Sequence, residues 1–214
     1  MKTITVKGVG TASKRPDLVV LSFGVITEES EYEAALAKAS DAVEELSAAL
    51  SGAGVGKPKT SSFDVRTEYK SVRDENGNYR QEFSGYSVTY RLKLELGFTM
   101  ESLRAALRAV SECKAMPEIS LTFGLSDPAA LDAELLENAA LNAKAKAEVL
   151  CRAMGKKLGE LVSVEYDWKD HQRVSDTKFE GVPLMAKCAG AAIADVDPED
   201  VKASDSASFV WEIV

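Results

Sequence analysis

The chain has 214 residues, of which 45% are hydrophobic and 28% charged, and its formal net charge at pH 7 is -8. A chain of this length and composition can bury a substantial core without disulfides or metals, which argues against a disordered or fibrous protein. The negative charge argues against a nucleic acid or an anionic membrane as the main partner, because both attract positive surfaces.

The start of the chain and its apolar runs indicate where in the cell the protein is expected. Residues 1–10 contain no continuous apolar stretch of the kind found in secretory signals. The sequence as written is therefore expected to be cytoplasmic, and the cell envelope is the alternative if a leader was removed. No apolar run approaches the ~20 residues that a membrane-spanning helix needs, so an integral membrane protein is not expected.

Two strands and a helix are expected first. The strands cover residues 3–11 and 17–27, and the apolar residues of the second strand share one face. A helix follows, because Ser30 and Glu33 have the spacing of a capping box and apolar residues then recur every three or four positions up to Gly52. We expect this apolar stripe to pack on the protein's own sheet, and a second subunit is the alternative. The stripe consists of Leu36, Ala39, Val43, Leu46 and Leu50.

A long antiparallel hairpin is expected next. Over residues 62–70 apolar and polar side chains alternate, as in a half-buried strand, and the same period of two returns over residues 86–96. The Asn76-Gly77 pair between them is typical of the two-residue turns that join antiparallel strands.

Two helices and a strand are expected in the second half. A short helix covers residues 100–113 with Thr99 as its N-cap, and a strand follows at 119–123. Asp127-Pro128 begins a long helix that ends at Gly155. The apolar stripe of this helix has alanines in its middle, which predicts that another backbone packs closely against it. The stripe consists of Leu131, Leu135, Ala139, Ala143, Ala147, Leu150 and Met154.

The last part of the chain combines two expected strands with an irregular segment. Alternation predicts strands at 162–168 and 207–213, whereas residues 169–206 show little periodicity. Because an unstructured segment of this length is unusual in a compact domain, it favours an arm or a partner-dependent segment. An excursion over the protein's own surface is the alternative.

The expected element order is ββαββ followed by αβαββ. This order is typical of an α+β fold, with antiparallel sheets and helices packed to one side, rather than of a doubly wound parallel fold. We expect one domain over residues 1–214, or two intimate lobes over about 1–98 and 99–214, with an irregular arm at 169–206.

Motifs for catalysis or cofactor binding are incomplete. Residues 51–58 approach a phosphate-binding loop, but Pro58 replaces the required Ser or Thr and the segment follows a helix instead of preceding one. Gly8-x-Gly10 lacks the third glycine of a dinucleotide turn, so close strand packing or a bulge is the better interpretation. His171 is the only histidine, which leaves no His-based metal cluster, and the three cysteines have no metal or disulfide spacing. The sequence therefore assigns no catalytic, cofactor-binding or metal-binding residue.

Four segments, in order along the chain, carry a resemblance to a known family. Residues 6–10 with Pro16-Asp17 are similar to an opening glycine pair and Pro-Asp, and residues 85–88 to a Gly-Tyr strand. Residues 139–159 are similar to an alanine-lysine helix with a Leu-Gly exit, and residues 201–214 to a closing strand. Together they resemble the SIMPL-domain family, which is abundant in bacteria, and the resemblance runs nearly end to end.

The resemblance implies an α+β fold, homo-oligomers in some members, stress resistance in some envelope members, and no accepted catalytic residues. We therefore expect a non-enzymatic, homo-oligomeric protein without cofactors that serves as a scaffold or a stress-related binding module. One alternative is a small-molecule binding protein or hydrolase with a pocket between the sheet and the long helix. Another is an adaptor that recruits a protein partner.

Overall fold

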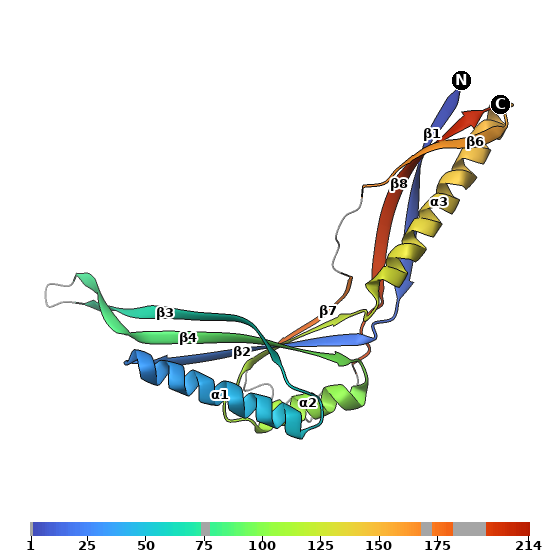
Figure 1. Cartoon of the computed structure of the whole chain (residues 1–214). Helices are drawn as coiled ribbons and strands as arrows, with labels where there is room; N and C mark the ends of the chain where they lie inside the picture. The colour runs from blue at the N-terminus through green and yellow to red at the C-terminus, as the bar shows by residue number, and fades with distance from the viewer. Residues whose placement is uncertain (1, 74–77, 168–172, 182–195) are drawn as a thin grey trace. The chain divides into compact units, whose positions relative to one another are not determined.

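The structure is a computed structural model that describes residues 2–73, 78–167, 173–181 and 196–214 (Figure 1). It confirms an α+β fold with antiparallel sheets. The elements in chain order are β1 (Thr3–Lys14), β2 (Leu18–Glu29), α1 (Tyr32–Gly52), β3 (Lys59–Arg73), β4 (Tyr79–Gly97), α2 (Met100–Glu112), β5 (Glu118–Gly124), α3 (Pro128–Ala153), β6 (Leu158–Glu165), β7 (Val174–Gly181) and β8 (Val201–Ile213).

Contacts within the chain group its residues into two compact units. Unit 1 consists of Met1–Pro16, Gly124–Asp176 and Pro198–Val214, and unit 2 of Asp17–Phe123 and Thr177–Asp197. This division differs from the expected halves that meet near residue 98. The reason is that β1 pairs with β8 along its whole length, which places the first and last strands in one unit.

Unit 1 is a three-stranded sheet that carries one long helix. Its strand order is β1-β8-β6, and both neighbouring pairs are antiparallel. The helix α3 packs mainly on β1, less on β8 and only slightly on β6 (Figure 1). As predicted, α3 begins at Asp127-Pro128. Asp127 caps the helix by accepting a hydrogen bond from the backbone N–H of Ala130, at 3.2 Å.

Two glycines of β1 let the strand and the helix touch backbone to backbone. A Cβ on Gly8 would overlap the carbonyl oxygen of Ala139 and lie 2.8 Å from the Cβ of Ala143. A Cβ on Gly10 would likewise overlap the carbonyl oxygen of Leu135. The structure thus confirms that the alanine stripe of α3 accepts a close backbone and that the glycine pair permits close packing.

The end of the α3 stripe differs from the prediction. The stripe is buried as far as Ala147, but Cys151 continues it, whereas Leu150 and Met154 are exposed. Spacing by four residues keeps Cys151 directly above Ala147 on the helix, so the buried face turns away from Leu150.

Unit 2 is a five-stranded sheet with the order β3-β4-β2-β5-β7. The helices α1 and α2 cover one face of this sheet, as predicted, and α1 packs on β2 and β4 (Figure 1). Alternation along β2 and β4 sends every second side chain into the core beneath these helices. The buried core includes Val19, Leu21, Phe23, Val25, Leu46, Leu50, Leu92, Leu103, Leu107, Val110, Leu121 and Phe123.

Two expectations about the first half were wrong. The helix α1 begins at Tyr32 with Glu31 at its N-cap, and no side chain caps it, so Ser30 stands one residue too early to complete a capping box. Strand β3 was expected to be half-buried, yet Phe63 and Tyr69 are exposed, because α1 covers β2 and β4 rather than this edge strand. Strands β3 and β4 do pair antiparallel, and the Asn76-Gly77 turn lies outside the described residues.

The irregular arm expected at 169–206 is partly strand. Strand β7 joins the edge of the unit 2 sheet and was not predicted. Strand β8 begins at Val201, as the family resemblance implied, and not at residue 207, as the alternation predicted. Strand β6 lies earlier than expected and ends at Glu165. These three differences share a cause: Asp, Gly and Ser interrupt the apolar alternation, and pairing with a neighbouring strand holds these residues extended.

Candidate functional site

The described residues contain no group of three or more His, Cys, Asp and Glu residues that could hold a metal ion. Two of the residues considered from the sequence, His171 and Cys188, lie outside them. Cys113 and Cys151 are buried free thiols, and burial raises the pKa of the Cys113 thiol above its usual value. Among the helices that the structure describes, none has the length and apolar character to cross a membrane.

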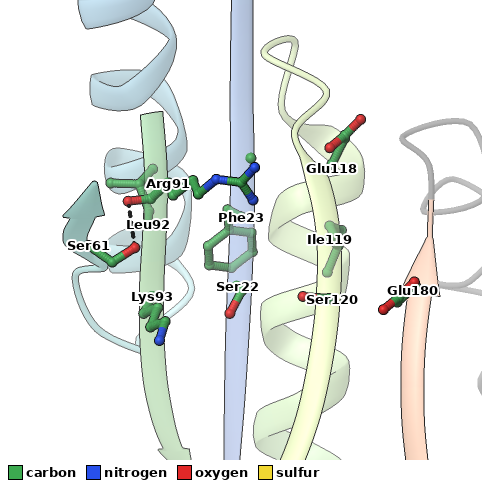
Figure 2. A pocket seen from close by; sticks show the side chains of 11 residues that line it. Ser22, Phe23, Ser61, Arg91, Leu92, Lys93, Glu118, Ile119, Ser120 and Glu180 are labelled. Atoms are coloured by element: carbon green, nitrogen blue, oxygen red, sulfur yellow. Dashed lines mark hydrogen bonds between the residues drawn. The ribbon is translucent and has the colours of Figure 1, made fainter. Parts of the chain in front are cut away.

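A groove of about 570 Å³ lies on the open face of the unit 2 sheet, opposite α1 and α2 (Figure 2). Five neighbouring strands contribute to it, because alternate residues of each strand point away from the helix-covered core. On β2, for example, Ser22 and Gly24 line the groove between the buried Leu21, Phe23 and Val25. The polar lining residues are Ser22, Ser61, Arg91, Lys93, Glu118, Ser120 and Glu180.

Opposite charges stand on opposite sides of this groove. Arg91 and Lys93 project from β4, whereas Glu118 projects from β5 and Glu180 from β7, with β2 between the two groups (Figure 2). No ion pair joins any of these four side chains to another residue in the described part of the chain. The groove thus holds two cations and two anions that do not neutralise one another by contact.

The free edge of β1 in unit 1 is closed by side chains of α3. The Asn142 Oδ1 atom accepts a hydrogen bond from the Val9 backbone N–H at 3.1 Å, and Asn138 Nδ2 donates to the Thr11 carbonyl oxygen at 3.0 Å. Lys146 Nζ donates to the carbonyl oxygen of Lys7 at 3.3 Å. The three side chains occupy the groups that an additional strand would need, so β1 is protected against pairing.

The free edge of β6 has no such protection. No described strand pairs with it, and no side chain in the described ranges is hydrogen-bonded to its backbone on that side. Three of its apolar side chains are about half exposed: Leu161 at 52%, Val162 at 45% and Val164 at 48%. Leu161 and Val164 lie opposite the buried Trp211 and Phe209 of β8, on the sheet face that α3 covers at β1 but scarcely reaches at β6.

The family is decided by a match along nearly the whole chain. Residues 4–211 match SIMPL, described as a protein of unknown function (DUF541). The chain belongs to the SIMPL family. No curated protein matches the sequence.

The motifs that carry the SIMPL resemblance lie at packing positions. The glycine pair of β1 faces α3, as described above. Gly85 has φ of +144° and sits beside a register shift in the β3–β4 ladder, where a Cβ would lie 3.0 Å from the backbone carbonyl carbon of Glu29. Only glycine accepts this conformation without strain, so the motif has a structural role in unit 2.

Neither the side chains that close the β1 edge nor the charged groove of this SIMPL protein was predicted from the sequence. Asn138, Asn142 and Lys146 each precede an alanine of the buried stripe, and this regular polar row beside the stripe was a signal that could have been found. The groove had no comparable signal, because Glu118 and Glu180 meet Arg91 only through the strand order β4-β2-β5-β7. Arg91 and Lys93 alternate with Leu92, which does predict that they face away from the core.

A hydrogen bond joins the end of β6 to the central strand β8. The Tyr166 hydroxyl donates to the Asp205 carboxylate at 2.9 Å. Burial and this hydrogen bond raise the pKa of Tyr166 above its usual value of 10.0. The neutral phenol therefore stabilises unit 1 of this SIMPL protein next to its open edge.

Proposed function

We propose that the chain is a self-assembling scaffold rather than an enzyme, and that two copies join through β6. The observation that carries this proposal is the contrast between the two edges of the unit 1 sheet. The β1 edge is occupied by three side chains of α3, whereas the β6 edge is open and apolar. An open apolar edge strand is a ready template for a strand from another chain.

The contrast between the edges selects the partner strand. A second copy cannot add its β1, since the backbone groups of that strand already bond to α3. It can add its own β6, and the same edge pairing with itself gives a closed, two-fold symmetric contact. Two three-stranded sheets would then form one sheet of six antiparallel strands.

Burial of apolar surface supplies the driving force. In a two-fold β6 pair, Leu161 and Val164 of both copies lie on the same face of the joined sheet, because the two-fold axis is perpendicular to it. These side chains gain cover between the two α3 helices. The bulges in the β6–β8 ladder limit how far the pairing can extend.

The test is the mass in solution, measured by size-exclusion chromatography with light scattering at two protein concentrations. The expected mass is twice 23.0 kDa. Replacing Leu161 and Val164 together with lysine places four positive charges in the contact and should give the monomer. The matched control replaces Leu141 and Val149, which are similarly exposed on α3, and should keep the dimer.

Circular dichroism of each variant shows whether it is folded. A wild-type mass of 23.0 kDa at both concentrations would refute the proposal. So would a dimer that survives the β6 substitutions in a folded protein, because the contact would then lie elsewhere.

A further inference from the structure

We infer that the groove on the open face of the unit 2 sheet binds a small dipolar molecule with a carboxylate at one end and an ammonium group at the other, as in a short peptide. This inference concerns unit 2 and does not depend on assembly through β6. It rests on the charges of the groove, their separation, and the residues between them.

The size of the groove suits a small ligand. Its volume of about 570 Å³ falls within the ~300–1,000 Å³ that is usual for small-molecule sites. Between the charged residues β2 lines the groove with Ser22, Phe23 and Gly24, and the Phe23 side chain is buried in the core, so the floor of the groove is low there. A Cβ on Gly24 would lie 3.3 Å from the Glu118 carboxylate, so the glycine lets that carboxylate lie close over β2.

The strand order sets the distance between the charges. Strands β4 and β5 are separated by β2, hence by two strand spacings, or about 10 Å. The Arg91 side chain reaches from β4 across β2 toward Glu118, which shortens the gap that a ligand must span (Figure 2). The ends of a dipeptide are about 7 Å apart, two residues at ~3.3–3.6 Å each, which is less than two strand spacings.

The charges select a dipolar ligand over a simple ion. A free anion would be attracted to Arg91 and Lys93 but repelled by Glu118 and Glu180. A metal cation would be attracted to the two glutamates and repelled by Arg91 and Lys93. A dipolar molecule can pair its carboxylate with the guanidinium and its ammonium with a glutamate at the same time. Charge-assisted hydrogen bonds of both kinds are among the stronger polar contacts in proteins.

Two hydroxyl groups lie where the middle of such a ligand would be. Ser22 on β2 and Ser120 on β5 line the groove, and no other residue that the structure describes forms a hydrogen bond with either hydroxyl. Ser61 differs, since its hydroxyl donates to the Arg91 carbonyl oxygen at 3.0 Å and thereby ties β3 to β4. The two free hydroxyls can bond to the amide of a dipeptide, which would fix its orientation.

The probe for this site is dialanine, compared with N-acetyl-dialanine and with dialanine amide. Titration calorimetry should detect binding of dialanine and at least a tenfold loss of affinity when either end is blocked. In a ¹⁵N-labelled protein the amide signals that shift should include those of Ser22, Gly24 and Ser120. No binding of dialanine at millimolar concentration would overturn the inference, and so would equal binding of the acetylated probe, which would define a plain anion site.

Variants test the two ends separately. Arg91→Gln and Glu118→Gln should each weaken dialanine binding at least tenfold. Glu118→Gln should have little effect on the binding of N-acetyl-dialanine, which has no ammonium group. The matched controls are Arg80→Gln and Glu82→Gln, exposed positions of β4 outside the groove, which should bind as the wild type does. Loss of binding in the controls, or its retention in both groove variants, would refute the site. The solution mass should be unchanged in all four variants, so a failure here is distinct from a failure of the β6 contact.

Discussion

The close contact between β1 and α3 can be tested by adding a single methyl group. An alanine at position 8 would place its Cβ on the carbonyl oxygen of Ala139 and 2.8 Å from the Cβ of Ala143, and an alanine at position 10 would strike the carbonyl oxygen of Leu135. These obstacles are backbone and short side chains, which cannot swing away, so α3 and β1 must separate. Overpacking of this kind costs about 1–3 kcal/mol.

The cost should be visible in thermal unfolding. For a protein of this length, 1 kcal/mol corresponds to roughly 2–4 °C in Tm, so Gly8→Ala and Gly10→Ala should each lower Tm by about 2–12 °C. The control is Gly52→Ala at the end of α1, where a Cβ would meet no atom within 4 Å. That variant should keep Tm or raise it slightly, because alanine is the better helix former. If Gly8→Ala and Gly10→Ala melted with the control, the backbone contact would not have the tight geometry described.

Three further substitutions test the closed edge of β1, the Tyr166 hydrogen bond and the cap of α2. Asn142→Ala frees the Val9 N–H, so it should cost about 0.5–1.5 kcal/mol in urea unfolding and increase self-association in light scattering; an unchanged mass would show that β1 needs no closure. Tyr166 has a raised pKa in the folded state, so its stabilising effect is present below pH 10.0 and is lost as the pH rises through the folded-state pKa. Tyr166→Phe should therefore flatten the loss of stability in alkaline urea titrations, and an identical profile would contradict this assignment. Thr99→Ala removes the side-chain cap of α2 and should cost about 1 kcal/mol, whereas no change in unfolding free energy would mean that the cap contributes nothing.

Local signals in the sequence were enough to predict most helices. The cap Thr99 and the helix start at Asp127-Pro128 lie where the sequence predicts them, and the side chains of Thr99 and Asp127 both accept a backbone hydrogen bond in the structure. The glycine pair and the alanine stripe also predicted close packing, because a row of small residues allows another backbone to approach. Ser30 shows the limit of such signals, since a motif with the right spacing can stand one residue away from the actual helix start.

Partners between distant strands could not be predicted in the same way. Strand β7 contains Asp176 and Gly181, residue types that are depleted in strands, and pairing with β5 decides its conformation. The groove depends on the same long-range order, because Glu118 faces Arg91 only once β2 lies between their strands. The alternation in a single sequence indicates on which face of a sheet each side chain lies. It does not indicate which strands are neighbours in that sheet.

The position of β8 at the centre of the unit 1 sheet has a consequence for biosynthesis. Of the three strands in that sheet, β8 leaves the ribosome last, and both β1 and β6 pair only with it among the described strands. Unit 2 has most of its core within Asp17–Phe123 and can mature cotranslationally. Until β8 is synthesised, β1 lacks a partner strand that lies almost two hundred residues further along the chain, so nascent unit 1 passes through a stage in which neither β1 nor β6 has the strand with which it pairs. Chaperones that assist folding should therefore bind at β1 and β6. They should no longer be needed once Val201–Ile213 has emerged from the ribosome.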